Sequence, residues 1–73
     1  MPIRLTSKQV IKILQHHGFI CISQNGSHQK WKNKNTGSIT IVPYHSDKQL
    51  PIGTLFSIIK ASGIDKTDFG FNS

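Results

Sequence analysis

The chain has 73 residues and a formal net charge of +6, because nine lysines and arginines are opposed by three aspartates. A chain of this size buries only about 60% of the surface that it exposes when unfolded, so a large enclosed cofactor cradle is excluded. The surplus positive charge attracts polyanions, and nucleic acid is therefore the expected partner.

Cysteine usage and hydropathy exclude further classes of protein. Cys21 is the only cysteine, so neither an internal disulfide nor a cysteine-based zinc framework can form. The sequence does not open with a basic-then-apolar signal segment, and its apolar runs are too short to cross a bilayer. We expect a cytoplasmic protein that does not enter a membrane.

The first predicted element is a helix that begins at Ser7. Thr6 and Gln9 have the spacing of a capping box, and Leu5 and Val10 have that of a hydrophobic staple. Apolar residues then recur at helical spacing, and the glycine at position 18 can take the left-handed conformation that ends a helix.

A β-hairpin is predicted next. The segment FICISQ is rich in β-branched and aromatic residues and leads into Asn25-Gly26, the strongest short-range signal for a two-residue hairpin turn. With these two residues as the loop, Ile20 faces Trp31 across the hairpin, and Ile20, Ile22 and Trp31 share the face that forms the core. The other face is predicted to meet solvent, and it collects Ser23, His28, Lys30, Lys32 and Lys34.

A third strand and a second helix follow. The turn signal NKNTG leads into SITIVP, where Ile39 and Ile41 alternate with polar residues and Pro43 closes the strand. A helix is predicted from about residue 54 to residue 62, with Gly63 as its stop. Its inward residues are Leu55, Ile58 and Ile59. A short turn from residue 65 should then bring Phe69 back to the core.

The predicted architecture is an α+β fold in the order α-β-β-β-α. Two amphipathic helices must cover one apolar face of a three-stranded antiparallel sheet, which leaves the other face bare. Residues 1–73 form a single domain, in which order is expected to fade after about residue 70. The bare face carries the basic strip of the second strand.

His28 is the candidate for chemistry on that strip, because imidazole exchanges protons near neutral pH without a large environmental shift. Lysines two, four and six residues further on could bind a phosphate beside which the ring moves a proton. The alternative is a solvated polar strand that carries a histidine by chance. His45, after the third strand, is either an auxiliary group or a partner of its own loop.

The other histidines and the carboxylates do not predict a metal site or a cofactor. His16 and His17 end the first helix, where interaction with the helix dipole is the preferred interpretation. Adjacent residues point roughly 100° apart around a helix, so the two rings cannot grip one metal ion. The spacings of known zinc motifs are absent from the sequence.

Four blocks occur in order along the chain: HHGF after the first helix, GSHQKW in the hairpin, TIVPYH out of the third strand, and LPIGTLFSIIKASGI over the last helix. Together they resemble the HicA toxins, also called the YcfA-like family, of bacterial and archaeal type II toxin-antitoxin pairs. The resemblance covers most of the chain. It implies a double-stranded-RNA-binding-domain-like fold and an mRNA-cleaving ribonuclease, or mRNA interferase, that works without metal.

The resemblance also assigns roles to residues. The catalytic histidine of the family's G-x-H motif corresponds to His28, preceded here by Gly26 and Ser27, and a HicB antitoxin is the expected protein partner. Many relatives carry a basic residue where this chain has Asn25. The contribution of that basic residue to RNA contact is therefore expected to be missing here. RNA contact is expected at Lys30, Lys32, Lys34, Ser27 and Gly26.

Two alternatives share the fold but not the activity. A non-catalytic RNA-binding module would carry basic residues at the start of the last helix, whereas GTLFSIIK has only Lys60, late in the helix. A protein-interaction domain would use the basic face to dock an acidic partner and would never meet RNA.

Overall fold

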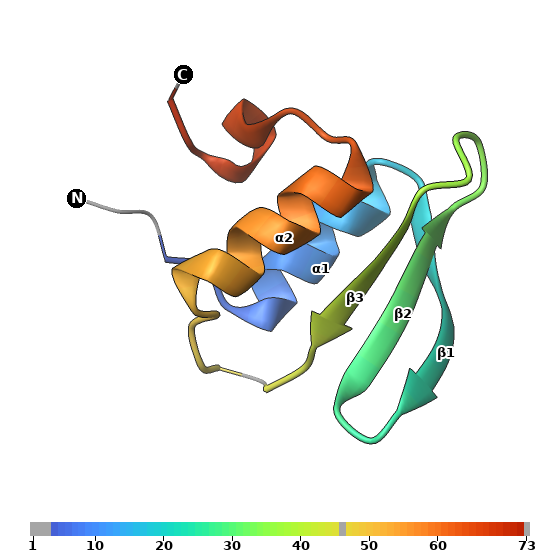
Figure 1. Ribbon diagram of the computed structural model, residues 1–73, viewed down its shortest axis with the longest axis horizontal. Helices are drawn as coiled ribbons and strands as arrows, with labels where there is room; N and C mark the ends of the chain where they lie inside the picture. Colours follow the sequence, from blue (N-terminus) through green and yellow to red (C-terminus); the bar gives the residue numbers. More distant parts are fainter. Residues whose placement is uncertain (1–3, 46, 73) are drawn as a thin grey trace.

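In the computed structural model, which describes residues 4–45 and 47–72, two helices pack on one face of a three-stranded antiparallel sheet (Figure 1). This confirms the predicted α+β fold in the order α-β-β-β-α. The elements are α1 (Ser7–His16), β1 (Phe19–Asn25), β2 (His28–Asn33), β3 (Ile39–Pro43), α2 (Ile52–Ser62) and the short 3-10 helix η1 (Lys66–Phe69).

Helix α1 begins where its capping box predicts. The backbone N–H of Gln9 donates to Thr6 Oγ1 at 3.2 Å, and the N–H of Thr6 donates to Gln9 Oε1 at 2.9 Å. These bonds satisfy donors that have no partner inside the helix. Val10 and Leu14 are fully buried against the sheet, and Gly18 follows with a φ of 91°.

Helix α2 and the segment after it also follow the sequence pattern. Leu55, Ile58 and Ile59 are buried, and Gly63 ends the helix in the left-handed conformation. The helix begins two residues earlier than predicted, with Pro51 as its N-cap. Proline is tolerated at this position, because the N–H that it lacks would have no acceptor inside the helix. Phe69 of η1 is buried against the helices, as predicted.

Asp65 caps η1 with its side chain. Its Oδ1 accepts from the backbone N–H of Thr67 at 2.9 Å and from the Thr67 hydroxyl at 2.8 Å. The backbone bond is the main cause that lowers the pKa of the Asp65 carboxyl below its ordinary value of 3.8. Charge-assisted bonds of this kind favour the ionised acid.

The hairpin turn differs from the prediction. Asn25 pairs with His28, so the two loop residues are Gly26 and Ser27 rather than Asn25 and Gly26. Gly26 takes the first loop position with a φ of 60°. In the predicted loop, Asn25 would occupy the first loop position, which needs a positive φ. Glycine adopts a positive φ more easily than asparagine, because it has no Cβ.

A β-bulge corrects the second part of the predicted hairpin. Ser23 pairs with Lys30 but Cys21 pairs with Trp31, so β1 carries one extra residue at Ile22. An extra residue reverses the facing of the strand beyond it, and Ile20 therefore lies opposite Lys32. The prediction that Ile20 and Ile22 belong to the core is wrong, because they are 42% and 45% exposed.

The second strand faces as predicted. Trp31 is buried under the helices, whereas Lys30 and Lys32 are exposed on the opposite face. On β3, the buried residues are Thr40 and Val42, and Ile39 and Ile41 face outward. The core cluster consists of Val10, Leu14, Phe19, Trp31, Val42, Leu50, Leu55, Ile58, Ile59 and Phe69.

Two further residues are placed by the register. Cys21 is exposed but pairs with Trp31, so it projects toward the helical side of the sheet at the edge strand. Asn33 is buried at the end of β2, where its Nδ2 donates to the carbonyl of His17 at 2.9 Å.

In the part of the chain that the structure describes, no helix is both long and apolar enough to span a membrane.

Candidate functional site

His28 opens strand β2 at the edge of the hairpin turn. Its cross-strand neighbours are Asn25 on β1 and Pro43 on β3, and its side chain is exposed. The imidazole therefore projects from the bare face of the sheet, opposite the helices, where a large substrate can approach without crossing a pocket mouth. This is the orientation that the sequence predicts for it.

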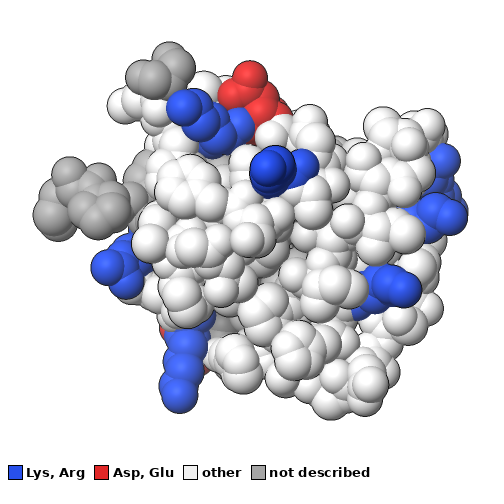
Figure 2. Space-filling model, in the orientation of Figure 1, with Lys and Arg blue, Asp and Glu red and all other residues white. Residues whose placement is uncertain are grey.

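Two of the three predicted lysines share this face with His28. Lys30 and Lys32 follow on the same strand with exposed side chains, each about 7 Å further along β2. Lys34 is exposed in the turn beyond the end of β2, so it does not belong to the strand as predicted. Figure 2 shows basic side chains at the right-hand edge, on the side of the sheet, and also at the top, in the upper middle, at the left and at the lower left of this view.

The turn residues Gly26 and Ser27 lie directly before His28. We call these three residues the His28 corner. Gly26 is exposed, with open space where a side chain would project. The carbonyl of Ser27 accepts a hydrogen bond from the backbone N–H of Tyr44 at 2.6 Å. This bond continues the pairing of β2 and β3 past Pro43 and holds the loop after β3 against the hairpin turn.

The same loop brings His45 to the His28 end of the sheet. The backbone N–H of His45 donates to Ser7 Oγ at 3.1 Å, and Ser7 is fully buried at the start of α1. The His45 side chain is exposed, two residues beyond the proline that pairs with His28. The backbone of His45 is thus bound to the start of α1, and its side chain lines a hollow with Leu50 and Thr54 on the helical side of the sheet.

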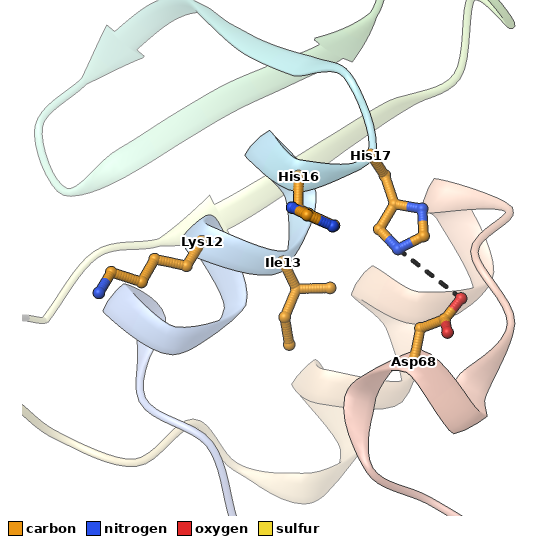
Figure 3. A pocket seen from close by; sticks show the side chains of 5 residues that line it. All are labelled: Lys12, Ile13, His16, His17 and Asp68. Atoms are coloured by element: carbon orange, nitrogen blue, oxygen red, sulfur yellow. Dashed lines mark ion pairs between the residues drawn. The ribbon is translucent and has the colours of Figure 1, made fainter.

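The remaining histidines lie on the helical side, away from this corner. Figure 3 shows His16 and His17 around a shallow hollow with Lys12 and Asp68. The rings of His16 and His17 meet edge to face, and His17 Nε2 lies 3.7 Å from Asp68 Oδ2. Both partners of this ion pair are partly exposed, so it contributes little stability. It joins η1 to the residue that follows α1.

The sequence did not predict a group of exposed apolar side chains beside the His28 strip. The four isoleucines of the two edge strands, at positions 20, 22, 39 and 41, are between 42% and 45% exposed. They lie on the bare face, on either side of the β2 lysines. The alternation of SITIVP indicates two opposite faces of β3 but not which of them the helices cover.

The structure does not bring together a metal-binding cluster in its described parts. Within residues 4–45 and 47–72, no three side chains of His, Cys, Asp or Glu are grouped so that they could hold an ion. The polar chemistry of the corner rests on imidazole, ammonium, hydroxyl and backbone groups.

Comparison with known protein families identifies the family to which the chain is similar. Residues 7–64, which run from the start of α1 to the residue after Gly63, match a family model described as the HicA toxin of bacterial toxin-antitoxin pairs. No curated protein matches the chain. The matched range contains the whole sheet, both helices and the His28 corner.

Proposed function

The chain belongs to the HicA toxin family, and on this premise we propose that it is an endoribonuclease, an mRNA interferase, that a HicB-like antitoxin neutralises. The observation that carries the proposal is the placement of His28 on an open sheet face, in line with Lys30 and Lys32. A flexible polyanion can reach such a face, whereas a small metabolite would find no enclosure there.

His28 acts as the general base in the proposed reaction. The 2′-hydroxyl next to the scissile phosphate is already positioned by the RNA chain, and it is the natural nucleophile. His28 takes the proton from this hydroxyl, the 2′-oxygen bonds to phosphorus, and the bond from phosphorus to the 5′-oxygen breaks. A proton then passes to the leaving oxygen, which gives a 2′,3′-cyclic phosphate and a 5′-hydroxyl.

The lysines bind and stabilise the phosphate. Negative charge accumulates on the phosphoryl oxygens as the 2′-oxygen attacks, and a fixed ammonium group lowers the energy of that state. We assign this role to Lys30, because it lies two residues from His28 on the same face of β2. Lys32 and Lys34 would hold flanking phosphates. The small residues Gly26 and Ser27 would leave room for the RNA to pass the hairpin turn.

His45 is the proposed source of the second proton. One histidine cannot deliver a proton to the leaving oxygen while it is accepting one from the nucleophile. His45 follows Pro43, the cross-strand partner of His28, by two residues, and its side chain is exposed. In its protonated form His45 would serve as the general acid.

The proposal is tested by cleavage of a fluorescent single-stranded RNA in the presence of EDTA. His28→Ala should lower the rate by about 10²- to 10⁴-fold, the usual contribution of a general acid or base. His16→Ala is the matched control, because it removes an exposed imidazole from the helical side. Retained cleavage in the His28→Ala protein would remove His28 from the mechanism.

The proposed role of His45 is tested in the same assay. His45→Ala should lower the cleavage rate if its imidazole supplies the second proton, and an unchanged rate would remove it from the mechanism. If every variant binds RNA but leaves it intact, the chain is an RNA-binding module rather than a nuclease.

A further inference from the structure

An open hollow beside helix α1 is not used by the proposed ribonuclease chemistry. Its volume is about 620 Å³, and its lining includes Lys8, Ile11 and Lys12 of α1 with Tyr44 and Asp47 of the loop after β3. We call it the Tyr44 hollow. Its volume lies within the range of about 300–1,000 Å³ that is typical of ligand sites. Because the hollow is open, a flat group attached to a longer chain can enter it.

The Tyr44 hollow begins where the basic strip ends. Tyr44 directly follows Pro43, the cross-strand partner of His28, and its backbone N–H donates to the carbonyl of Ser27 at 2.6 Å. One cross-strand pair and one peptide step separate the Cα atoms of His28 and Tyr44 by at most about 9 Å. Figure 1 shows the end of β3 beside the start of α1. An RNA strand that follows the basic strip past His28 therefore reaches the Tyr44 hollow next.

Two lysines give the hollow a positive wall. Lys8 and Lys12 are exposed and lie one turn apart on α1, although like charges at this spacing weaken a helix slightly. Neither lysine forms an ion pair with a carboxylate of the described residues, and Lys12 extends away from Asp68 (Figure 3). Both ammonium groups can therefore bind the oxygens of a phosphate.

Tyr44 supplies an aromatic surface inside the hollow. It is half-buried, so the protein holds the ring while part of it lines the open space. Single-stranded RNA is bound largely through bases that stack on aromatic rings. The tryptophan and the phenylalanine of the sheet, Trp31 and Phe19, are buried in the core and cannot serve in this way. Tyr44 offers a stacking surface next to the His28 corner.

Asp47 adds a hydrogen-bond acceptor to the same hollow. Its side chain is exposed and lines the space together with Tyr44 and the two lysines. A carboxylate repels phosphate, but it accepts from the amino groups of cytosine and adenine. Uracil carries a carbonyl oxygen where cytosine carries its amino group, and a carboxylate does not attract that oxygen. The mixed charge of the hollow thus fits a whole nucleotide better than a phosphate alone.

We propose that the Tyr44 hollow binds one nucleotide of the RNA substrate next to the cleavage site and prefers a base with an exocyclic amino group over uracil. This inference rests on the proposed ribonuclease function. The base stacks on Tyr44 and donates to Asp47, while the adjoining phosphates contact Lys8 and Lys12. A strand held on both sides of His28 is presented in one register. The hollow would therefore help to select which phosphate reaches the imidazole.

The test compares the affinities of short single-stranded oligocytidine and oligouridine in a His28→Ala background, in which the RNA stays intact. The unaltered hollow should bind oligocytidine at least about fivefold more tightly, as expected for one hydrogen bond to a carboxylate. Asp47→Asn should reduce this preference to less than about twofold. Tyr44→Leu should weaken the binding of both RNAs by about 5- to 150-fold, which corresponds to one lost base stack. Tyr44→Phe keeps the ring and should restore binding.

Phe56→Leu is the matched control, because Phe56 is an aromatic residue of α2 that is 46% exposed. It should leave both affinities within about twofold of the unaltered values. Lys8→Gln/Lys12→Gln changes only exposed positions, and it keeps the proposal testable if Tyr44→Leu fails to fold. This variant should flatten the log-log dependence of affinity on salt by about 1.4, or 0.7 for each phosphate.

Three results would each overturn the proposal: equal affinity of the unaltered hollow for the two RNAs, normal binding by a folded Tyr44→Leu protein, or an unchanged salt slope in the double lysine variant. The ribonuclease function is judged separately, by cleavage with His28 present. If the wild type leaves RNA intact while the affinity pattern holds, the ribonuclease proposal fails and the nucleotide site stands. Cleavage without a preference for oligocytidine rejects the nucleotide site alone.

Discussion

Replacing Asn33 by alanine should destabilise the protein, because it removes three hydrogen bonds at once. The Asn33 side chain is only 6% exposed and joins three parts of the chain. Its Nδ2 donates to the carbonyl of His17 at 2.9 Å, and its Oδ1 accepts from the N–H groups of Asn35 at 2.8 Å and Thr36 at 3.2 Å. It therefore ties the end of α1 to the turn between β2 and β3.

The magnitude follows from these three bonds. Each contributes a net 0.5–1.5 kcal/mol, so their joint loss costs about 2–4 kcal/mol. The N–H groups of Asn35 and Thr36 lie in an exposed turn and can bond water instead, whereas the His17 carbonyl is partly buried. This places Asn33→Ala at about 2–3 kcal/mol, a large share of the roughly 5 kcal/mol expected of a small domain.

Urea unfolding followed by the fluorescence of Trp31, the only tryptophan, measures this loss directly. Asn35→Ala is the matched control, because Asn35 is exposed and its bond to Asn33 uses the backbone. The control should stay within about 0.5 kcal/mol of the wild type. A loss below about 1 kcal/mol for Asn33→Ala, or equal losses for both variants, would refute the reasoning.

Two further predictions concern charge. Because the pKa of Asp65 is lowered from 3.8, mainly by the Thr67 N–H, its stabilising effect is present above that pH and is lost as the pH falls through the lowered value. Asp65→Ala should therefore have a slightly lower thermal midpoint than the wild type at pH 6, and the gap should close in strong acid; a gap that stays constant would contradict this. Lys30→Gln/Lys32→Gln should flatten the log-log dependence of single-strand RNA affinity on salt by about 1.4, or 0.7 for each phosphate that is no longer neutralised. Unchanged slope in a filter-binding titration would show that these lysines do not touch phosphate.

The sequence predicts those parts of the fold that depend on local chemistry. The capping box of Thr6 and Gln9 and the left-handed glycine after α2 act within a few residues, and both are confirmed. The outward orientation of His28 is also as predicted. Its partner on β1 is Asn25 instead of the predicted Ser23, which is a shift of two residues. A shift of two keeps the same face, since strand side chains alternate with a period of two.

What the sequence could not predict depends on contacts between distant segments. Asn25-Gly26 and Gly26-Ser27 are both plausible turns, and only the completed sheet selects between them. The bulge at Ile22 has no local signature, yet it moves Ile20 from the core to the bare face. The buried side of β3 is likewise decided by where the helices pack, and so the exposure of Ile39 and Ile41 could not be predicted from alternation alone.

The pairing of Cys21 with Trp31 provides a ready spectroscopic handle. The chain has one thiol and one indole, and they lie opposite each other on adjacent strands, on the helical side of the sheet. A dye attached to the exposed sulfur would sit near the natural fluorophore and away from the His28 corner. Energy transfer between the two would then report hairpin formation in real time, without a substitution.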